Sequence, residues 1–175
     1  MDERARFSRF ADSLVWLSNA GVALPVYCVD EPVYPLKISS STNLFKLFFS
    51  DVGLLTSTFM EAATLDILAK NLNVNYGAIY ENAVAQEFNT AGFELYYYRN
   101  KKRGELDFLL EDIQGKVMPI EVKSGKDYKR HNALSNLLES AEYHLNEGFV
   151  LCGGNLSRAG KITYLPIYMA GFFDG

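Results

Sequence analysis

The chain carries two carboxylates whose spacing suits a shared metal ion. Asp107 lies in a run that alternates like a β-strand, residues 105–111, and Glu121 lies in a second such run, residues 117–123. The three-residue loop 113–115 ends on a glycine, which suits a position with positive φ. This loop length predicts a hairpin with Asp107 directly opposite Glu121. Side chains so placed have Cβ atoms roughly 5 Å apart.

Two carboxylates at that separation repel each other, so we expect a bound cation to compensate them. Mg²⁺, or Mn²⁺ in its place, is the expected ion, because it is usually held by one or two carboxylates together with water and phosphate oxygens. Lys123 shares the face of Glu121 and would add a positive charge that stabilises a phosphate group. The alternative is a solvated hairpin whose outer face carries charges of both signs.

The apolar residues of the two runs predict which face of the hairpin is buried. Period-two alternation assigns six side chains to that face: Leu106, Phe108, Leu110, Met118, Ile120 and Val122. Glu105, Asp107 and Leu109 share the other face of the first run. Glu121 and Lys123 are likewise expected opposite the apolar side chains.

A helix is expected upstream, over residues 77–91. Its residues divide into an apolar stripe and an opposite polar side: Tyr80, Val84, Phe88 and Ala91 against Asn82, Gln86 and Asn89. Glu81 and Glu87 flank the stripe, where a carboxylate costs free energy unless it is paired or bound to metal. We expect Glu81 to approach Asp107 as a further ligand and Glu87 to reach water. A Glu81 side chain that also reaches round to water is the alternative.

The predicted elements follow one another as helix 77–91, strands 93–99, 105–111 and 117–123, a helix over about 130–145, and strand 148–152. This order resembles the PD-(D/E)XK nuclease superfamily, whose core is αβββαβ. The superfamily signature, an acid on the first helix, Asp on the second strand and Glu-x-Lys on the third, maps onto four residues: Glu81, Asp107, Glu121 and Lys123. Leu106 stands where the superfamily name has proline.

That resemblance implies an α/β fold with a restriction-endonuclease-like core, in which helices flank a mixed central sheet. It also implies Mg²⁺-dependent hydrolysis of DNA phosphodiester bonds, with Glu81, Asp107 and Glu121 as metal ligands and Lys123 stabilising charge.

A second resemblance covers nearly the whole chain. Five segments are similar to the DUF4143 family: 45–55, 77–82, 96–99, 104–108 and 120–124. In that family the domain follows an AAA-type or P-loop ATPase module and a winged-helix-like segment, and its biochemical activity is poorly defined. The resemblance implies that an ATPase module of a longer parent chain is a partner. We therefore expect this chain to be a fragment, with a natural stand-alone domain as the alternative.

No ATP site is expected in this chain. The nearest approach to a phosphate-binding loop, residues 154–162, has five residues between its glycines instead of four, and Ile162 where Mg²⁺ needs Ser or Thr. We interpret the glycine-rich segment as a hairpin loop that joins strand 148–152 to a strand over 161–165.

The N-terminal third predicts a small unit of its own. Helical spacing runs from Phe7 to Leu17, and residues 22–29 alternate like a strand. We expect residues 1–36 to be part of a winged-helix-like segment, the polar run 37–43 to be a linker, and residues 44–175 to form the nuclease-like domain.

Net charge is −4, which disfavours indiscriminate DNA binding, but the basic residues are clustered. Nine of the seventeen Lys and Arg residues fall between Arg99 and Arg130. We expect seven of them to contact nucleic-acid phosphates: Arg99, Lys101, Lys102, Arg103, Lys126, Lys129 and Arg130. A charged loop beside the start of a helix is the alternative interpretation.

Composition is that of a globular chain, with 49% hydrophobic residues and no run of about eighteen apolar residues that could span a membrane. We expect a cytoplasmic protein without a membrane partner, because no apolar signal core follows Met1. Cys28 and Cys152 are interpreted as reduced core thiols.

Two function classes follow from these residues. The first is a metal-dependent nuclease-like enzyme. The second is an inactive nucleic-acid-binding or protein-interaction module attached to an ATPase that performs the chemistry itself. The first is favoured, because four charged residues at these positions serve a metal site better than they serve a fold.

Overall fold

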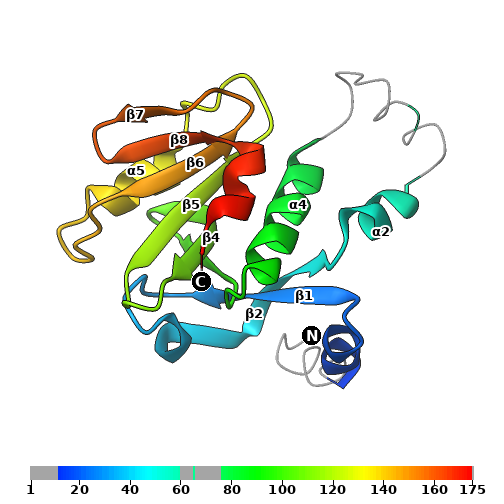
Figure 1. The fold of residues 1–175 in the computed structure, drawn as a ribbon. Helices are drawn as coiled ribbons and strands as arrows, with labels where there is room; N and C mark the ends of the chain where they lie inside the picture. The colour runs from blue at the N-terminus through cyan, green and yellow to red at the C-terminus, as the bar shows by residue number, and fades with distance from the viewer. Residues whose placement is uncertain (1–11, 60–64, 66–75, 175) are drawn as a thin grey trace.

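The computed structural model describes residues 12–59, 65 and 76–174, and within them eight strands form one mixed sheet (Figure 1). The strand order is β2-β1-β3-β4-β5-β6-β8-β7. The strands are β1 (Ala23–Val29), β2 (Ser40–Phe49), β3 (Tyr96–Asn100), β4 (Gly104–Glu111), β5 (Val117–Lys123), β6 (Gly148–Cys152), β7 (Ser157–Ala159) and β8 (Ile162–Pro166). The helices are α2 (Val52–Ser57), α4 (Tyr76–Thr90) and α5 (Asn132–Leu138), with 3-10 turns η1 (Leu36–Ser39) and η2 (Ile167–Phe172).

The central part of the sheet has the predicted order of elements. After α4, strands β3, β4 and β5 form an antiparallel meander, and the chain then passes through α5 to β6, which lies parallel to β5. The bounds of β5 and β6 are those predicted from the alternation. The predicted α/β class and mixed, helix-flanked sheet are therefore confirmed. Helix α5 is shorter than predicted and ends at Leu138.

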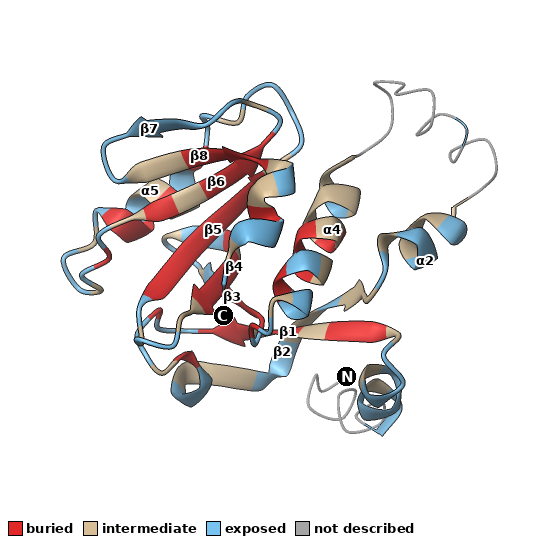
Figure 2. Ribbon diagram, viewed as in Figure 1, coloured by how far each residue is buried: buried red, intermediate tan, exposed pale blue. Residues whose placement is uncertain are grey.

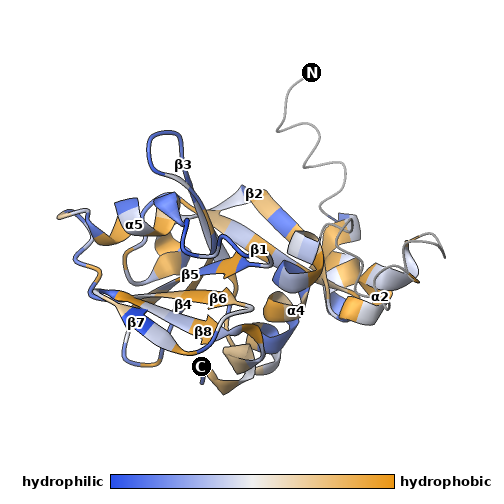
Figure 3. Ribbon diagram, turned by 90° about the horizontal axis from the view of Figure 1, so that it is seen from above, coloured by the Kyte–Doolittle hydropathy of each residue, from blue (hydrophilic) through white to orange (hydrophobic). Residues whose placement is uncertain are grey.

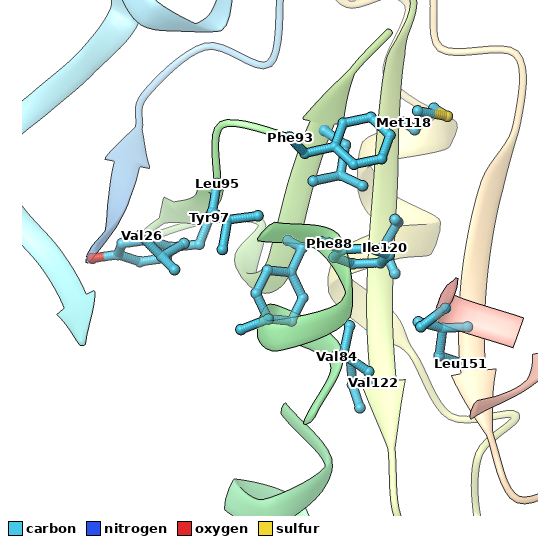
Figure 4. Close-up of a cluster of buried hydrophobic side chains, with 14 of the residues drawn as sticks. Val26, Val84, Phe88, Phe93, Leu95, Tyr97, Met118, Ile120, Val122 and Leu151 are labelled. Atoms are coloured by element: carbon cyan, nitrogen blue, oxygen red, sulfur yellow. The ribbon is translucent and has the colours of Figure 1, made fainter. Parts of the chain in front are cut away.

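Helices cover both faces of the sheet, so both faces are buried. On one face, α4 packs Val84 and Phe88 against Ile120 and Val122 of β5 (Figure 4). On the other face, α5 packs against β4 and β5. Figure 2 shows β5 buried along nearly its whole length. Leu109, predicted on the face opposite the apolar side chains, is fully buried because this second face is a core as well.

A β-bulge in β4 changes which way its side chains point. Tyr96 pairs with Leu109 and Tyr98 pairs with Leu106, so two steps along β3 match three steps along β4. The predicted grouping of Leu106 with Phe108 was therefore wrong. Leu106 packs with Tyr98 in the core under α5, whereas Phe108 packs under α4. The extra residue lies in the stretch that contains Asp107.

Strands β1 and β2 belong to the main sheet. β1 pairs in parallel with β3, and β2 pairs with β1 as an edge strand. The predicted linker 37–43 was wrong, because these residues form most of η1 and the start of β2. The backbone of Ser40 and Ser41 is paired with β1. The predicted first helix is described over residues 12–19, and its start, residues 1–11, lies outside the described residues.

Strands β6 and β8 are parallel, so the hairpin predicted between them was wrong. The connecting segment forms β7, which returns along the outer edge of the sheet and pairs antiparallel with β8. Gly160, with φ of 58°, makes the tight turn from β7 into β8. Glycines occur in this segment as expected. The turn at Gly160, however, joins β8 to β7, a strand that the alternation did not predict.

Two residues of the polar side of α4, Asn82 and Gln86, bind backbone groups of the protein, whereas the third, Asn89, is exposed. Asn82 is buried, and its amide accepts a hydrogen bond from the backbone N–H of Phe49 at 2.8 Å and donates to the Phe49 carbonyl at 3.0 Å. Gln86 accepts a hydrogen bond from the N–H of Val52 at 2.9 Å. These amides bind half-buried backbone groups at the end of β2 and the start of α2.

Replacing Asn82 with Ala is expected to lower the free energy of unfolding by about 2 to 4 kcal/mol, because it leaves both backbone groups of Phe49 without their partner. Urea denaturation followed by circular dichroism measures the change. Asn89→Ala, an exposed position on the same helix, is the matched control and should shift stability by less than about 0.5 kcal/mol. Equal effects of the two substitutions would contradict the structural role of Asn82.

Two further features concern the cysteines and the search for membrane-spanning helices. Cys28 and Cys152 are buried free thiols, as predicted. Across the part of the chain that the structure describes, no helix combines the length and apolar character needed to span a membrane.

Candidate active site

The turn between β4 and β5 sets the relative position of the two predicted carboxylates. Asp112 closes the turn by accepting hydrogen bonds from the N–H groups of Gln114 and Lys116, both at 2.9 Å, and Gly115 adopts a φ of 79°. This is the predicted three-residue loop with its left-handed glycine. The resulting register pairs Phe108 with Ile120, so Asp107 and Glu121 are the next residues beyond the last paired positions.

Asp107 is held between the two strands by a backbone contact. Its Oδ2 accepts a hydrogen bond from the N–H of Val122 at 2.8 Å. Burial raises the pKa of this carboxyl above its ordinary value, and the Val122 hydrogen bond opposes that shift by favouring the charged form. The hydrogen bond fixes one carboxylate oxygen and leaves Oδ1 to face other groups.

Glu121 is the most deeply buried acid of the site, with 6% of its surface exposed. Burial raises the pKa of Glu121 to about 7, and the charge of Asp107 adds to the shift. Its Oε1 lies 2.6 Å from Nζ of Lys123, which makes Lys123 its ion-pair partner. Its Oε2 is buried and makes no hydrogen bond to any residue that the structure describes.

Glu81 approaches the same group from α4. Burial raises the pKa of Glu81, and the nearby charge of Asp107 raises it further, so the two carboxylates lie within electrostatic range. Glu87 lies elsewhere: it is exposed and adjoins Gly171 of η2. The helix therefore directs the first of its two flanking acids toward Asp107 and the second toward solvent.

Two charged residues, Lys46 and Glu105, were not predicted to belong to the site. Lys46 of β2 places its Nζ 2.7 Å from Oε1 of Glu105 and 3.9 Å from Oδ1 of Asp107. The signal was present, because Lys46 interrupts the apolar run 45–49, and a lysine in a half-buried strand needs a partner. What the sequence could not show is that β2 joins this sheet. We call Glu81, Glu105, Asp107 and Glu121 the carboxylate cluster.

The cluster has features of a divalent-cation site. Glu121 Oε2 is a buried oxygen without a hydrogen-bond partner among the described residues, and the charge of Asp107 raises the pKa of Glu121 through a repulsion that a cation would relieve. Among the residues described, no group of three or more His, Cys, Asp or Glu side chains is arranged to bind a metal. Mg²⁺ would therefore be held by Asp107 and Glu121 with water and phosphate oxygens, as this ion commonly is.

The predicted phosphate-binding residues lie at the same end of the sheet as the cluster. Lys101 and Lys102 occupy the turn between β3 and β4, which projects from the sheet as a strongly hydrophilic tip (Figure 3). Lys126, Lys129 and Arg130 follow β5 and are also exposed. These five side chains form no ion pair with any other described residue.

Arg99 and Arg103 differ from the other basic residues because they have acidic partners. Arg103 donates hydrogen bonds to Glu142 and to the hydroxyl of Tyr143, both at 2.8 Å. Arg99 lies 3.8 Å from Glu105. A cavity of about 790 Å³ beside this region is lined by Cys28, Asp30, Arg99 and Lys101 among others. Arg103 ties the segment after α5 to the β3–β4 turn and is less available for phosphate than the two lysines.

Comparison with known proteins identifies a family but no function. Residues 76–169, from α4 to η2, match the family described as Domain of unknown function (DUF4143). No curated protein and no solved structure matches the chain significantly. The matched segment contains Glu81, Asp107 and Glu121, whereas Lys46 lies before it.

Proposed function

Because the chain belongs to the family of unknown function DUF4143, we propose its activity from the site itself: Mg²⁺-dependent, nuclease-like hydrolysis of phosphodiester bonds in DNA. In this proposal the central elements form a restriction-endonuclease-like αβββαβ core of the PD-(D/E)XK type. The order α4, β3, β4, β5, α5, β6 supports that assignment. The domain would serve a parent chain that also contains an AAA-type ATPase module.

One observation carries the proposal. Asp107 and Glu121 occupy neighbouring positions where β4 and β5 stop pairing, the charge of Asp107 raises the pKa of Glu121, and both acids are largely removed from water. A fold does not need this arrangement, because two adjacent buried acids oppose folding, and Lys46 and Lys123 offset that cost only in part, since the pKa of each acid is still raised. Perturbed acids that gather at one point of a sheet are typical of functional sites.

The chain's own residues would divide the work as follows. Asp107 and Glu121 would hold the ion, and Glu81 would act as a further ligand or orient bound water. When bound, Mg²⁺ supplies Lewis acidity toward a phosphoryl oxygen and lowers the pKa of water. Lys123, which lies 2.6 Å from Glu121, would stabilise negative charge that develops on the phosphate.

The proposal is tested with the purified domain and labelled single- and double-stranded DNA. We expect cleavage that requires Mg²⁺ or Mn²⁺ and stops on addition of EDTA, together with Mn²⁺ binding in calorimetry. Asp107→Asn, prepared in parallel, identifies any contaminating nuclease. Absence of both DNA cleavage and metal binding would refute the proposed nuclease activity.

A second function fits the same surface. Exposed Lys101, Lys102 and Lys126 supply positive charge whether or not the carboxylates act, so an inactive nucleic-acid-binding or protein-interaction module attached to the ATPase is the alternative. It is favoured if DNA binds without being cut and Asp107→Asn leaves the activity of the parent ATPase unchanged.

Replacing Lys101 and Lys102 together with Ala is expected to weaken DNA binding and to reduce the slope of log K against log salt by about 2, since two phosphate contacts are lost. Fluorescence anisotropy between low and moderate salt measures the slope. The double variant Lys37→Ala and Lys116→Ala is the matched control, because it lowers the net charge by the same two units as the Lys101 and Lys102 variant. Lys116 lies in the β4–β5 turn, at the opposite end of β4. An unchanged slope in the Lys101 and Lys102 variant would remove the turn from the binding surface.

A further inference from the structure

Lys46 reaches the carboxylate cluster from β2, the edge strand of the sheet. β2 lies three strands from β4 in the sheet order, yet the Lys46 ammonium is 2.7 Å from Glu105 and 3.9 Å from Asp107. Its path runs over the ring of Tyr97 on β3, with Nζ 5.0 Å from the ring centroid. The aromatic face stabilises the cation and guides it toward β4.

This lysine is packed rather than free in solvent. Its side chain is 24% exposed, compared with 75% for Lys37, whose pair with Glu94 lies on the surface. Lys46 also acts electrostatically on Glu81 and Glu121, so it influences every member of the carboxylate cluster. A cation held this way cannot be exchanged for water without leaving Glu105 and Asp107 uncompensated.

Charge balance then limits what else the site can hold. When ionised, the four acids of the carboxylate cluster carry four negative charges, and Lys46, Lys123 and Arg99 together cancel three of them. One divalent ion more than offsets the remaining charge, and a second ion would leave the site strongly positive. In two-metal sites the ions lie about 3.5 to 4 Å apart and share a carboxylate between them. Here the Asp107 oxygen that does not bind the N–H of Val122, Oδ1, already lies 3.9 Å from the Lys46 ammonium.

We propose that Lys46 occupies the place of a second metal ion, so that the carboxylate cluster binds one divalent ion per chain. The proposal rests on the metal-dependent function proposed above. It makes Lys46 a positioning residue that sets the charge and occupancy of the site. The residue lies outside the segment that matches the family, so the strand β2 contributes to a site whose other members lie within that segment.

The test is the number of Mn²⁺ ions bound per chain, measured by calorimetry and by electron paramagnetic resonance of free Mn²⁺. We expect one ion for the wild-type protein and two for Lys46→Met, which keeps an apolar stem over Tyr97 but removes the charge. Lys46→Arg, which retains a cation, should bind one ion. Lys37→Met is the matched control at a remote surface pair and should also bind one.

Each result decides the proposal. Two ions on the wild-type protein, or no additional ion on Lys46→Met, would overturn it. Where Lys46→Met does not fold, as judged by circular dichroism, Lys46→Gln provides the same count with a neutral donor beside Glu105. No ion on the wild-type protein but one on the Met variant refutes both the metal-dependent function and the count of one ion per chain, and shows instead that Lys46 excludes metal from the site. No ion on either protein refutes both.

Discussion

Replacing Glu121 with Gln is expected to raise the free energy of unfolding at pH 8 by about 3 kcal/mol when no divalent metal is present. Burial, reinforced by the charge of Asp107, raises the pKa of Glu121 from its ordinary 4.5 to about 7 in the folded protein. Ionising this acid therefore costs more in the folded chain than in the unfolded chain. Gln removes that cost and keeps a similar volume in the core.

The sign of the pH dependence follows from the direction of that shift. Between pH 4.5 and 7 the folded protein binds more protons at Glu121 than the unfolded chain does. The stability that this group contributes is complete below 4.5 and is lost as the pH rises through 7. The advantage of the Gln variant should thus be absent near pH 4.5 and complete at pH 8.

Urea denaturation in EDTA at these two pH values measures the effect. Glu139→Gln, an exposed acid at the end of α5, is the control and should change stability little at either pH. Saturating Mg²⁺ should reverse the order at pH 8, because an ion held by Glu121 stabilises only the wild-type fold. A Gln variant that is less stable than wild type at pH 8 without metal would contradict the electrostatic account of Glu121.

The β4–β5 hairpin shows how much of the candidate site the sequence determines locally. Alternation gave the bounds of β5, and Gly115 with a three-residue loop gave the register that brings Asp107 beside Glu121. These features depend on residues close together in the chain. Turn chemistry and strand period act at that range, so they can be predicted from one sequence.

The features that the sequence did not predict depend on residues far apart in the chain. The bulge in β4 arises from pairing with β3, and both Leu106 and Phe108 are apolar, so no change of residue type marks the break in alternation. Lys46 reaches the site only because β1 pairs with both β2 and β3 and so joins β2 to the sheet. Alternation identifies a strand but not its neighbour, which is also why the parallel pairing of β6 and β8 was missed.

The bulge also explains the direction in which the Asp107 side chain points. An unbroken alternation would place Asp107 on the same face as Leu109, which packs in the core under α5. The extra residue instead lets its carboxylate reach the N–H of Val122 on β5 and face Lys46. Bulges commonly redirect a side chain beside an active site in this way. Both the backbone contact and the charge of Asp107 must therefore be considered in any substitution.

Asp107→Asn is expected to reduce metal-dependent DNA cleavage by at least about 10³-fold, because a lost ligand removes several kcal/mol of transition-state stabilisation. The amide keeps an oxygen that can accept the Val122 hydrogen bond, so the fold should persist. Ala is the poorer choice at this position, since it leaves that N–H without its partner.

Cleavage rates at saturating Mn²⁺, together with Mn²⁺ affinity from calorimetry, test this expectation. Asp127→Asn, an exposed acid in the segment that follows β5, is the control and should cleave at nearly the wild-type rate. DNA affinity measured in EDTA should be no weaker in Asp107→Asn than in wild type, because removing an anion cannot weaken attraction to phosphate. Full cleavage by Asp107→Asn would mean that the activity resides elsewhere. Weaker DNA binding by this variant would mean that Asp107 supports the binding surface and not a metal ion.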